Sequence, residues 1–297
     1  MRVFVTGASG FIGQAVVPEL IRAGHEVLGL ARSDAAASAI EAAGASVHRG
    51  SIEDLESLAR GAAAADGVIH LAYHHDFSDI PGAATKDRRV IQAIGEALSA
   101  TGKPFVGTLG TLLIAPGRVV TEEDEPSNPD AHPRFASEKL LLSFAGRGVR
   151  ASVVRLSPTV HGAGDHAFVP ALIDLARRKG VSAYVGDGSD RWSAVHRMDA
   201  ARLFRLALEK GAAGTRYHGV ADEGVRLREV AAVIGRQLNL PVVSRSKQEA
   251  SDHFGWLAFF LSADSPASSA LTRERLGWEP THASLIADLE NGTYFPG

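Results

Sequence analysis

The sequence predicts an α/β protein in which a doubly wound parallel sheet is followed by a smaller C-terminal lobe. Three observations support this prediction. Over residues 1–160, short apolar runs rich in β-branched residues alternate with helical segments, which favours parallel strands joined by right-handed crossovers. A glycine-rich run joins the first strand to the first helix. After residue 160 the alternation weakens, and loops rich in Gly, Asp and His become common.

The elements of the first part follow from the apolar runs and from the periodicity of the segments between them. We expect strands at 2–6, 26–30, 45–48, 66–72, 104–109 and 150–156. We expect helices near 11–23, 34–43, 53–60, 85–101 and 134–147. Helices of this length between the strands are able to cover both faces of the sheet, so residues 1–160 are predicted to form one domain.

The glycine-rich run Thr6-Gly7-Ala8-Ser9-Gly10-Phe11-Ile12-Gly13 predicts a Rossmann-type dinucleotide site. Gly7 allows a tight turn, Gly10 lets backbone N–H groups approach a pyrophosphate, and Gly13 lets the helix pack closely on the sheet. The phosphates are expected at the helix N-terminus. The predicted cofactor contacts here are Gly7, Ser9, Gly10, Phe11 and Ile12. The alternative is a glycine-rich turn that serves packing alone.

Beyond residue 160, helical patterns cover 168–179, 198–210, 227–238 and 247–261. We expect residues 161–297 to form mainly a substrate-binding lobe, with the segment near 192–220 returning to the first domain. Ligands of open parallel sheets bind outside the carboxyl ends of the strands. The binding cleft is therefore expected between the two parts.

The composition excludes several classes of function. A net charge of −3 gives no reason to expect nucleic acid or an anionic membrane as a partner. The chain has no cysteine, so disulfides, thiolate catalysis and cysteine metal sites are excluded. Met1 is followed directly by the first strand, so we expect no signal peptide and a cytoplasmic location. The apolar run 254–261 is too short to span a bilayer and is expected to be a buried helix.

Three further segments resemble the extended and atypical short-chain dehydrogenase/reductases, a group of NAD(P)-dependent epimerases, dehydratases and reductases. Residues 68–72 (VIHLA) look like the family's fourth strand, whose end lies beside the cofactor, which implies contacts from Leu71 and Ala72. Residues 155–162 (RLSPTVHG) are similar to its R-x-x-x-V-Y-G segment, and residues 186–199 to its G-D-G…R…V-H-V-x-D segment. The resemblance implies a small-molecule substrate and a homodimer formed through the helices at 85–101 and 134–147.

The end of the second strand predicts the cofactor. NAD-binding relatives carry an acidic residue there, whereas this chain has Ala31 followed by Arg32 and Ser33. A guanidinium binds the additional phosphate of NADP with charge-assisted hydrogen bonds, which a carboxylate would repel. The sequence therefore favours NADP(H) over NAD(H). Asp34 keeps NAD(H) as an alternative, and in that case Arg32 is a solvated surface residue.

The usual catalytic position is altered. The family carries Y-x-x-x-K on the helix before the sixth strand, where tyrosine exchanges the substrate proton and lysine lowers the tyrosine pKa and holds the nicotinamide ribose. Here the segment reads Phe135-Ala136-Ser137-Glu138-Lys139, so the tyrosine is missing and the resemblance implies only that Lys139 orients the cofactor. The alternative is a core phenylalanine beside a surface lysine.

The family's substrate-orienting serine is also missing. A direct match places Gly110 at that position, and Thr111 and Thr108 carry the nearest hydroxyl groups. We predict Thr111 as the group that orients a carbonyl. Either threonine is alternatively a cap of the strand end.

Other residues offer replacement proton donors or pocket walls. Tyr73, His74 and His75 follow the fourth strand, and His161 follows the sixth. Each is a candidate acid or a polar pocket-lining residue. Arg191 and Trp192 are further predicted to line the substrate pocket. The spacing of the histidines supports no metal site, so none is predicted.

Three functions remain open from the sequence. The favoured one is an NADPH-dependent oxidoreductase that transfers hydride to a small or mid-sized carbonyl, imine or activated alkene. The second is a catalytically silent NADP-binding sensor or regulator. The third is an NAD(P)-dependent epimerase or dehydratase, against which the missing tyrosine counts because that chemistry begins by deprotonating a hydroxyl group.

Overall fold

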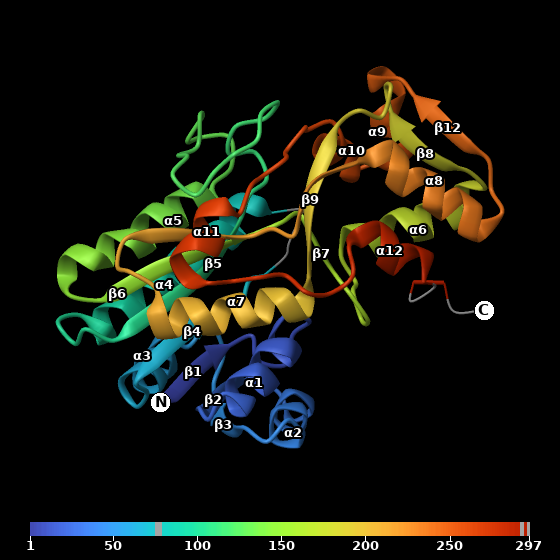
Figure 1. The fold of residues 1–297 in the computed structure, drawn as a ribbon. Helices are drawn as coiled ribbons and strands as arrows, with labels where there is room; N and C mark the ends of the chain where they lie inside the picture. Colours follow the sequence, from blue (N-terminus) through green and yellow to red (C-terminus); the bar gives the residue numbers. More distant parts are fainter. Residues whose placement is uncertain (75–78, 292–293, 296–297) are drawn as a thin grey trace.

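A seven-stranded parallel sheet forms the centre of the computed structural model, which describes residues 1–74, 79–291 and 294–295. Its strand order is β10-β6-β5-β4-β1-β2-β3, and every pairing is parallel (Figure 1). The strands are β1 (Arg2–Thr6), β2 (Glu26–Ala31), β3 (Ser46–Arg49), β4 (Gly67–His70), β5 (Pro104–Gly110), β6 (Arg150–Leu156) and β10 (Thr215–Gly219). The predicted fold class is confirmed.

Helices cover both faces of this sheet because each buries one apolar stripe against it. One core contains buried residues of α1 (Gly13–Arg22), α2 (Asp34–Ala42) and α7 (Arg197–Lys210). The core on the opposite face contains buried residues of α3 (Leu55–Ala63), α4 (Ile80–Leu98) and α5 (Arg134–Ser143). A short 3₁₀ helix, η1 (Phe144–Arg147), follows α5. The sheet is therefore doubly wound.

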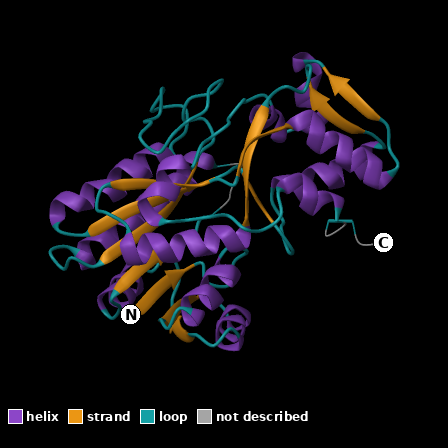
Figure 2. Cartoon of the chain, in the orientation of Figure 1, coloured by secondary structure: helices purple, strands orange, loops and turns teal. Residues whose placement is uncertain are grey.

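The remaining elements surround a third apolar core. Strands β7 (Thr159–His161), β9 (Arg191–His196) and β11 (Asp222–Arg226) form one small sheet, and β8 (Ser182–Val185) pairs with β12 (Val242–Arg245). The helices of this part are α6 (Phe168–Lys179), α8 (Leu227–Leu238), α9 (Lys247–Phe254), α10 (Leu257–Leu261), α11 (Ala270–Leu276) and α12 (Leu285–Glu290). Figure 2 shows the short strands of this part apart from the central sheet. Between β9 and β11 the chain returns to the central sheet through α7 and β10. The domain boundary at residue 160 stays a prediction.

Three expectations about single elements were wrong. The segment 247–261 is not one helix: Gly255 has a φ of +58°, which breaks it into α9 and α10. The run 254–261 is not wholly buried either, since Trp256 is 47% and Phe259 60% exposed. The helix expected at 85–101 begins earlier, at Ile80, where the Asp79 side chain accepts a hydrogen bond from the Gly82 N–H at 2.9 Å. Within the described residues, no helix is long and apolar enough to cross a bilayer.

A buried histidine on β10 predicts how the fold responds to acid. His218 is fully buried, and its Nδ1 donates to the Ser268 carbonyl oxygen at 2.8 Å. Burial, with a contribution from the charge of Arg155, lowers the pKa of His218 to about 3. Histidine in an unfolded chain titrates near pH ~6.5. Between these two values the unfolded chain binds more protons than the folded one, so the free energy of unfolding falls as the pH falls.

We therefore expect the protein to lose stability from about pH 6.5 downward, before the carboxylates begin to titrate. In His218→Asn the amide preserves a donor for Ser268 but takes up no proton, so the loss between about pH 6.5 and 4.5 is expected to be smaller. Denaturant unfolding of both proteins at the two pH values measures the difference. An equal loss in both proteins would show that other groups, such as the partly buried His196, dominate the acid response.

Candidate functional site

The glycine turn after β1 has the packing that a dinucleotide site requires. Gly7 has a φ of +71°, and a Cβ on it would lie 2.8 Å from the Ala72 nitrogen. A Cβ on Gly13 would lie 2.1 Å from the Gly7 carbonyl oxygen, so only glycine fits where α1 crosses the turn. Gly10 differs because it is exposed, and a Cβ there would meet only the Gly7 oxygen, at 3.2 Å. This glycine leaves the backbone open to a ligand.

The beginning of α1 fits an anion. Its N-cap residue, Ile12, makes no side-chain capping bond, and the first turn contains no acidic residue. The first N–H groups of a helix have no partner within the helix, and the helix dipole favours negative charge there. Ser9 and Phe11 lie in the turn just before, and the Ser9 carbonyl accepts from the Gln14 amide at 3.1 Å. The chemistry of these groups is suited to a pyrophosphate.

Two arginines and one carboxylate lie at the neighbouring ends of β2 and β3. Arg32 and Ser33 are exposed, and the Ser33 hydroxyl accepts from the Ala36 N–H at 3.2 Å as the N-cap of α2. Arg49 on β3 is the register partner of Ala31, and its Nη2 lies 2.8 Å from the Asp34 carboxylate. Asp34 is thus partnered by a cation. Sequence reasoning missed Arg49, although its place at the end of the adjacent strand was available as a signal.

The end of β4 is tied to the glycine turn through a buried histidine. His70 Nδ1 lies 2.6 Å from the Thr6 hydroxyl, and its Nε2 lies 3.3 Å from Asp87 of α4. The Thr6 hydroxyl also accepts from the Ala72 N–H at 3.3 Å. Because Leu71 and Ala72 lie directly against Gly7, the residues that follow β4 stand beside the turn. Tyr73 comes next in the chain and is half-buried.

Arg134, the first residue of α5, packs on Tyr73. Its guanidinium carbon lies 3.9 Å from the centre of the Tyr73 ring, and its Nη2 donates to the Thr108 carbonyl oxygen at 2.7 Å. Its Nε lies 4.0 Å from the Asp87 carboxylate. Burial would raise the pKa of Asp87, but the His70 hydrogen bond and the charges of His70 and Arg134 bring it below its ordinary value. Burial raises the pKa of Tyr73, an effect that the Arg134 charge opposes.

The predicted Phe135 and Lys139 pair lies on a different side of α5. Phe135 is buried in the core between α4, α5 and the sheet, with its ring edge-on to His132, and Lys139 is exposed. The face directed at β5 and β6 carries Arg134 and Glu138 instead, because these contact Thr108 and Arg155. This placement matches the alternative of a core phenylalanine beside a surface lysine. The cofactor role of Lys139 stays a prediction.

The other predicted polar groups at the strand ends point into the protein. Thr111 is buried, and its hydroxyl lies 3.3 Å from that of Ser193. The Thr108 hydroxyl donates to the His70 carbonyl oxygen at 2.8 Å. His161 is completely buried, with Nδ1 2.8 Å from the Asp288 carboxylate. Each of the three groups has an internal partner, although the His161 Nε2 has none among the described residues. Their roles toward substrate stay predictions.

The residues predicted to line the substrate pocket are engaged in the second part of the fold. Arg191 makes a two-pronged contact with Asp264, with nitrogen–oxygen distances of 3.0 and 2.8 Å. Trp192 is buried and donates from Nε1 to the Phe260 carbonyl oxygen at 3.2 Å. His74 is exposed beside Tyr73. His75 lies outside the described residues. The contacts of Arg191 and Trp192 are thus with Asp264 and Phe260, away from Arg134.

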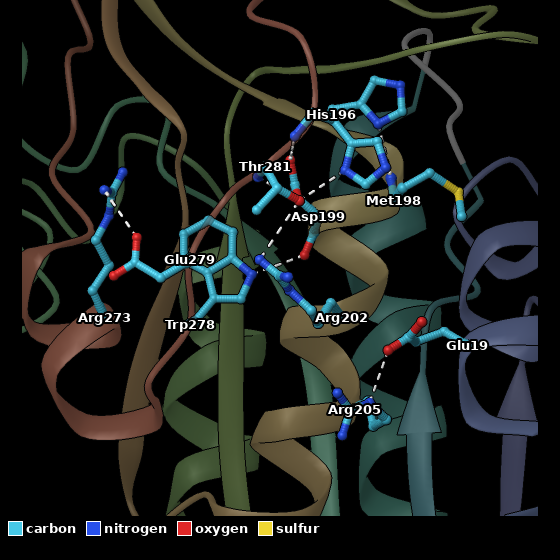
Figure 3. A network of polar contacts seen from close by, with 11 residues as sticks. Glu19, His196, Met198, Asp199, Arg202, Arg205, Arg273, Trp278, Glu279 and Thr281 are labelled. Carbon is cyan, nitrogen blue, oxygen red and sulfur yellow. Dashed lines mark hydrogen bonds and ion pairs between the residues drawn. The ribbon is translucent and has the colours of Figure 1, made fainter. Parts of the chain in front are cut away.

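A network around Asp199 fixes the junction of β9 and α7 (Figure 3). The Asp199 carboxylate accepts from the backbone N–H groups of Thr281 and His282, each at 3.0 Å, and lies 2.9 Å from the His282 ring nitrogen. The His196 ring stacks on His282 with centroids 4.7 Å apart. This network binds the segment after α11 to the start of α7. Sequence reasoning missed it, because its partners lie more than 80 residues apart.

The start of α7 reaches the glycine turn. The Arg197 guanidinium lies 5.1 Å from the centre of the Phe11 ring, and His166 meets the same ring edge-on at 5.8 Å. Phe11 follows Gly10 directly, so residues of the second part of the fold stand over the turn. The described site therefore lies where the two parts meet at the carboxyl ends of the strands, as open parallel sheets require.

Comparisons with known proteins agree with this architecture. The model of the NAD dependent epimerase/dehydratase family matches residues 3–220. The chain is 53% identical to an uncharacterized protein of Schizosaccharomyces pombe over 99% of this chain and all of that one. It is 29% identical, over 90% of this chain and 84% of the other, to the 4-hydroxy-2-methyl-3-oxo-4-farnesyl-3,4-dihydroquinoline-1-oxide ketoreductase of Stigmatella aurantiaca.

Solved structures share the fold. The dTDP-glucose 4,6-dehydratase of Streptomyces venezuelae, in a double mutant with NAD bound, superposes with a TM-score of 0.79 at 20% identity. The alignment covers 99% of this chain and 97% of that one. The family model spans most of the chain, including the glycine turn and the end of β4. The chain therefore belongs to the NAD dependent epimerase/dehydratase family.

Proposed function

We propose that this protein is an NADPH-dependent reductase of a small or mid-sized organic substrate with a carbonyl, imine or activated alkene. The observation that carries the proposal is the position of Tyr73. It follows Ala72, whose backbone lies against Gly7 of the glycine turn, at the edge of the sheet where ligands bind. A residue whose hydroxyl group is able to donate a proton thus follows directly on the backbone that lies against the glycine turn. A cytoplasmic location and a homodimer stay predictions.

The chemistry divides between cofactor and protein. When bound, the reduced nicotinamide supplies a hydride to the electrophilic carbon of the substrate. The Tyr73 hydroxyl gives its proton to the carbonyl oxygen, which completes the alcohol, and the resulting tyrosinate regains a proton from water. Gly7, Gly10 and Gly13, with the start of α1, would hold the pyrophosphate. An iminium substrate needs no proton at this step, so its reduction depends less on Tyr73.

The charges at the end of β2 support NADPH over NADH. Arg32 and Arg49 stand at this edge, and the one carboxylate beside them, Asp34, is paired with Arg49. This pair is highly exposed and therefore weak, so Arg49 is free to exchange Asp34 for a phosphate. A guanidinium binds phosphate through two parallel hydrogen bonds. We propose that both arginines bind the additional phosphate of NADPH.

Fluorescence titration with NADPH and NADH tests the cofactor assignment. We expect NADPH to bind more tightly, and Arg32→Ala to weaken NADPH binding about tenfold with NADH nearly unchanged, because a charge-assisted hydrogen bond contributes about 1.5–3 kcal/mol. Arg60→Ala, which removes an exposed arginine of α3 paired only with Glu56 among the described contacts, is the matched control. Equal or tighter binding of NADH by the unaltered protein would refute the assignment.

Turnover on a ketone, an imine and an enone with NADPH tests the reaction. We expect oxidation of NADPH with at least one of the three classes, measured by the loss of nicotinamide absorbance. NADPH binding without turnover on any of them would favour a silent binding protein and would contradict the proposed reductase. Isomerisation of a substrate without net oxidation of the cofactor would instead identify an epimerase or dehydratase.

A further inference from the structure

Two residues of α5, Arg134 and Lys139, are candidates for the cation of the active site. Each belongs to a pair of residues four positions apart. Successive helix residues are rotated by about 100°, so positions four apart share a side. One pair is Phe135 and Lys139, and the other is Arg134 and Glu138. Glu138 is buried and binds Arg155 of β6, with nitrogen–oxygen distances of 2.8 and 2.6 Å. This contact turns the side of Arg134 and Glu138 toward the sheet and leaves Lys139 exposed.

Arg134 is held in place from three directions. Its Nη2 donates to the Thr108 carbonyl oxygen on β5, and its Nε faces the buried Asp87 of α4. Its guanidinium lies against the ring of Tyr73, just after β4. Asp87 is in turn bound to His70, which contacts Thr6 at the start of the glycine turn. A continuous set of polar contacts thus connects Arg134 to the turn at which the dinucleotide is expected.

We infer that Arg134, rather than Lys139, is the positioning cation of this active site and acts by holding the Tyr73 ring and stabilising its ionised form. The inference rests on the proposed function. A guanidinium on the face of an aromatic ring fixes the orientation of the ring and stays charged at any working pH. Its positive charge favours the tyrosinate that remains after the proton has been given to substrate. The reacting proton belongs to Tyr73, and Arg134 acts through that residue.

The pH dependence of turnover reports this role. A proton donor must be protonated to act, so activity declines on the alkaline side as Tyr73 ionises. The charged and titratable groups around it come from each neighbouring element: Arg134 from α5, Asp87 from α4, His70 from β4, His132 before α5, and the adjacent His74. Of these, only Arg134 lies on the ring in the described contacts. The decline of kcat at high pH is the alkaline limb of the profile. Removing the charge of Arg134 should move this limb to higher pH.

The experiment compares five variants in steady-state ketone reduction, with kcat, KM and the pH profile of kcat measured for each. Arg134→Met is expected to lower kcat about 100-fold, the scale of general-acid catalysis, and to shift the alkaline limb upward. Arg134→Lys retains the charge without the planar stack, so we expect a kcat nearer to that of the unaltered protein and a limb at its original pH. Arg88→Met, which removes a neighbouring arginine that donates to the Pro133 carbonyl oxygen, is the matched control.

Lys139→Met is the competing variant. If Lys139 holds the nicotinamide ribose, this change weakens NADPH binding and lowers kcat more than Arg134→Met does, and that outcome overturns the inference. A loss of kcat in Arg134→Met without movement of the alkaline limb, and without recovery in Arg134→Lys, shows a purely structural role and also overturns it. Should Arg134→Met fail to fold, Arg134→Gln takes its place, because the amide is also uncharged but keeps polar contacts: an alkaline limb at higher pH supports the inference, and a limb at its original pH refutes it.

Tyr73→Phe separates this inference from the proposed function. If Tyr73→Phe retains full ketone turnover, Tyr73 is not the donor, and the proton route of the proposed function fails together with the role of Arg134. If Tyr73→Phe is inactive while Arg134→Met matches the Arg88→Met control, the proposed function stands and only the inference about Arg134 fails. Reduction of a preformed iminium by Tyr73→Phe shows that its cofactor site is intact.

Discussion

Gly13→Ala is expected to destabilise the fold by about 3 kcal/mol and to abolish NADPH binding, because overpacking against an inflexible backbone is among the most damaging substitutions. The added Cβ would lie 2.1 Å from the Gly7 oxygen and 2.6 Å from the Ala8 oxygen. Both are backbone atoms of the turn, so the clash is relieved only if α1 moves away from β1. Such a movement separates the helix N-terminus from the phosphates that it is proposed to bind.

Gly10→Ala and Gly146→Ala are the two comparison variants for Gly13→Ala. At Gly10 the Cβ would meet only the Gly7 oxygen, at 3.2 Å, so we expect nearly normal stability but weaker NADPH binding. At Gly146 a Cβ would meet nothing within 4 Å, and both properties should remain normal. Denaturant unfolding and fluorescence titration measure the two properties separately. A Gly13→Ala protein as stable as Gly146→Ala would contradict the packing argument.

Glu138→Gln is expected to cost about 3–5 kcal/mol of unfolding free energy, because it leaves a buried guanidinium without its counter-charge. Arg155 is 0% exposed and makes both of its short carboxylate contacts to Glu138. Arg216 donates to the same carboxylate at 2.6 Å but also pairs with the exposed Glu125 at 3.3 Å, so the loss falls mainly on Arg155. The amide retains the shape of the side chain, and the loss therefore reports charge rather than a cavity.

Glu56→Gln is the control for this effect. Glu56 pairs with Arg60 on α3, but the two side chains are 90% and 63% exposed. Exposed ion pairs contribute about 0–1 kcal/mol, so this variant should unfold almost as the unaltered protein does. Urea denaturation of both variants at neutral pH gives the comparison. Similar losses in the two variants would mean that burial of the Glu138–Arg155 pair adds nothing to the free energy of unfolding.

The parts of the fold that could be predicted are those specified by local sequence. Alternating apolar runs and helical segments determine the parallel sheet, since a strand, a helix and the return strand lie close together in the chain. The glycine turn is equally local, and its roles for Gly7 and Gly13 agree with the packing that the structure shows. The break at Gly255 was missed because an isolated glycine inside a helical pattern is tolerated and does not by itself show that the helix ends.

The site could be predicted only in part, because contacts across the fold decide the rest. Residue spacing identified two side chains four apart on α5, but it did not show which side of the helix faces the sheet. That orientation depends on Glu138 binding Arg155, and Arg155 lies on another strand. In the same way, residue spacing did not show that His161, predicted in the pocket, contacts Asp288, which lies 127 residues further along the chain.

The sequence by itself determined the fold class, the family resemblance and the place of the dinucleotide turn, because each depends on residues within about one strand, turn and helix. Only the tertiary structure decided which charges meet. It pairs Asp34 with Arg49, ties His70 to Thr6 and Asp87, and sets Arg134 on the ring of Tyr73. Each of these contacts forms when separate strands and helices pack together. For the buried Thr6, His70 and Asp87, the physical reason is that burial leaves polar groups few partners other than one another. The exposed Arg49 meets Asp34 because β3 pairs alongside β2.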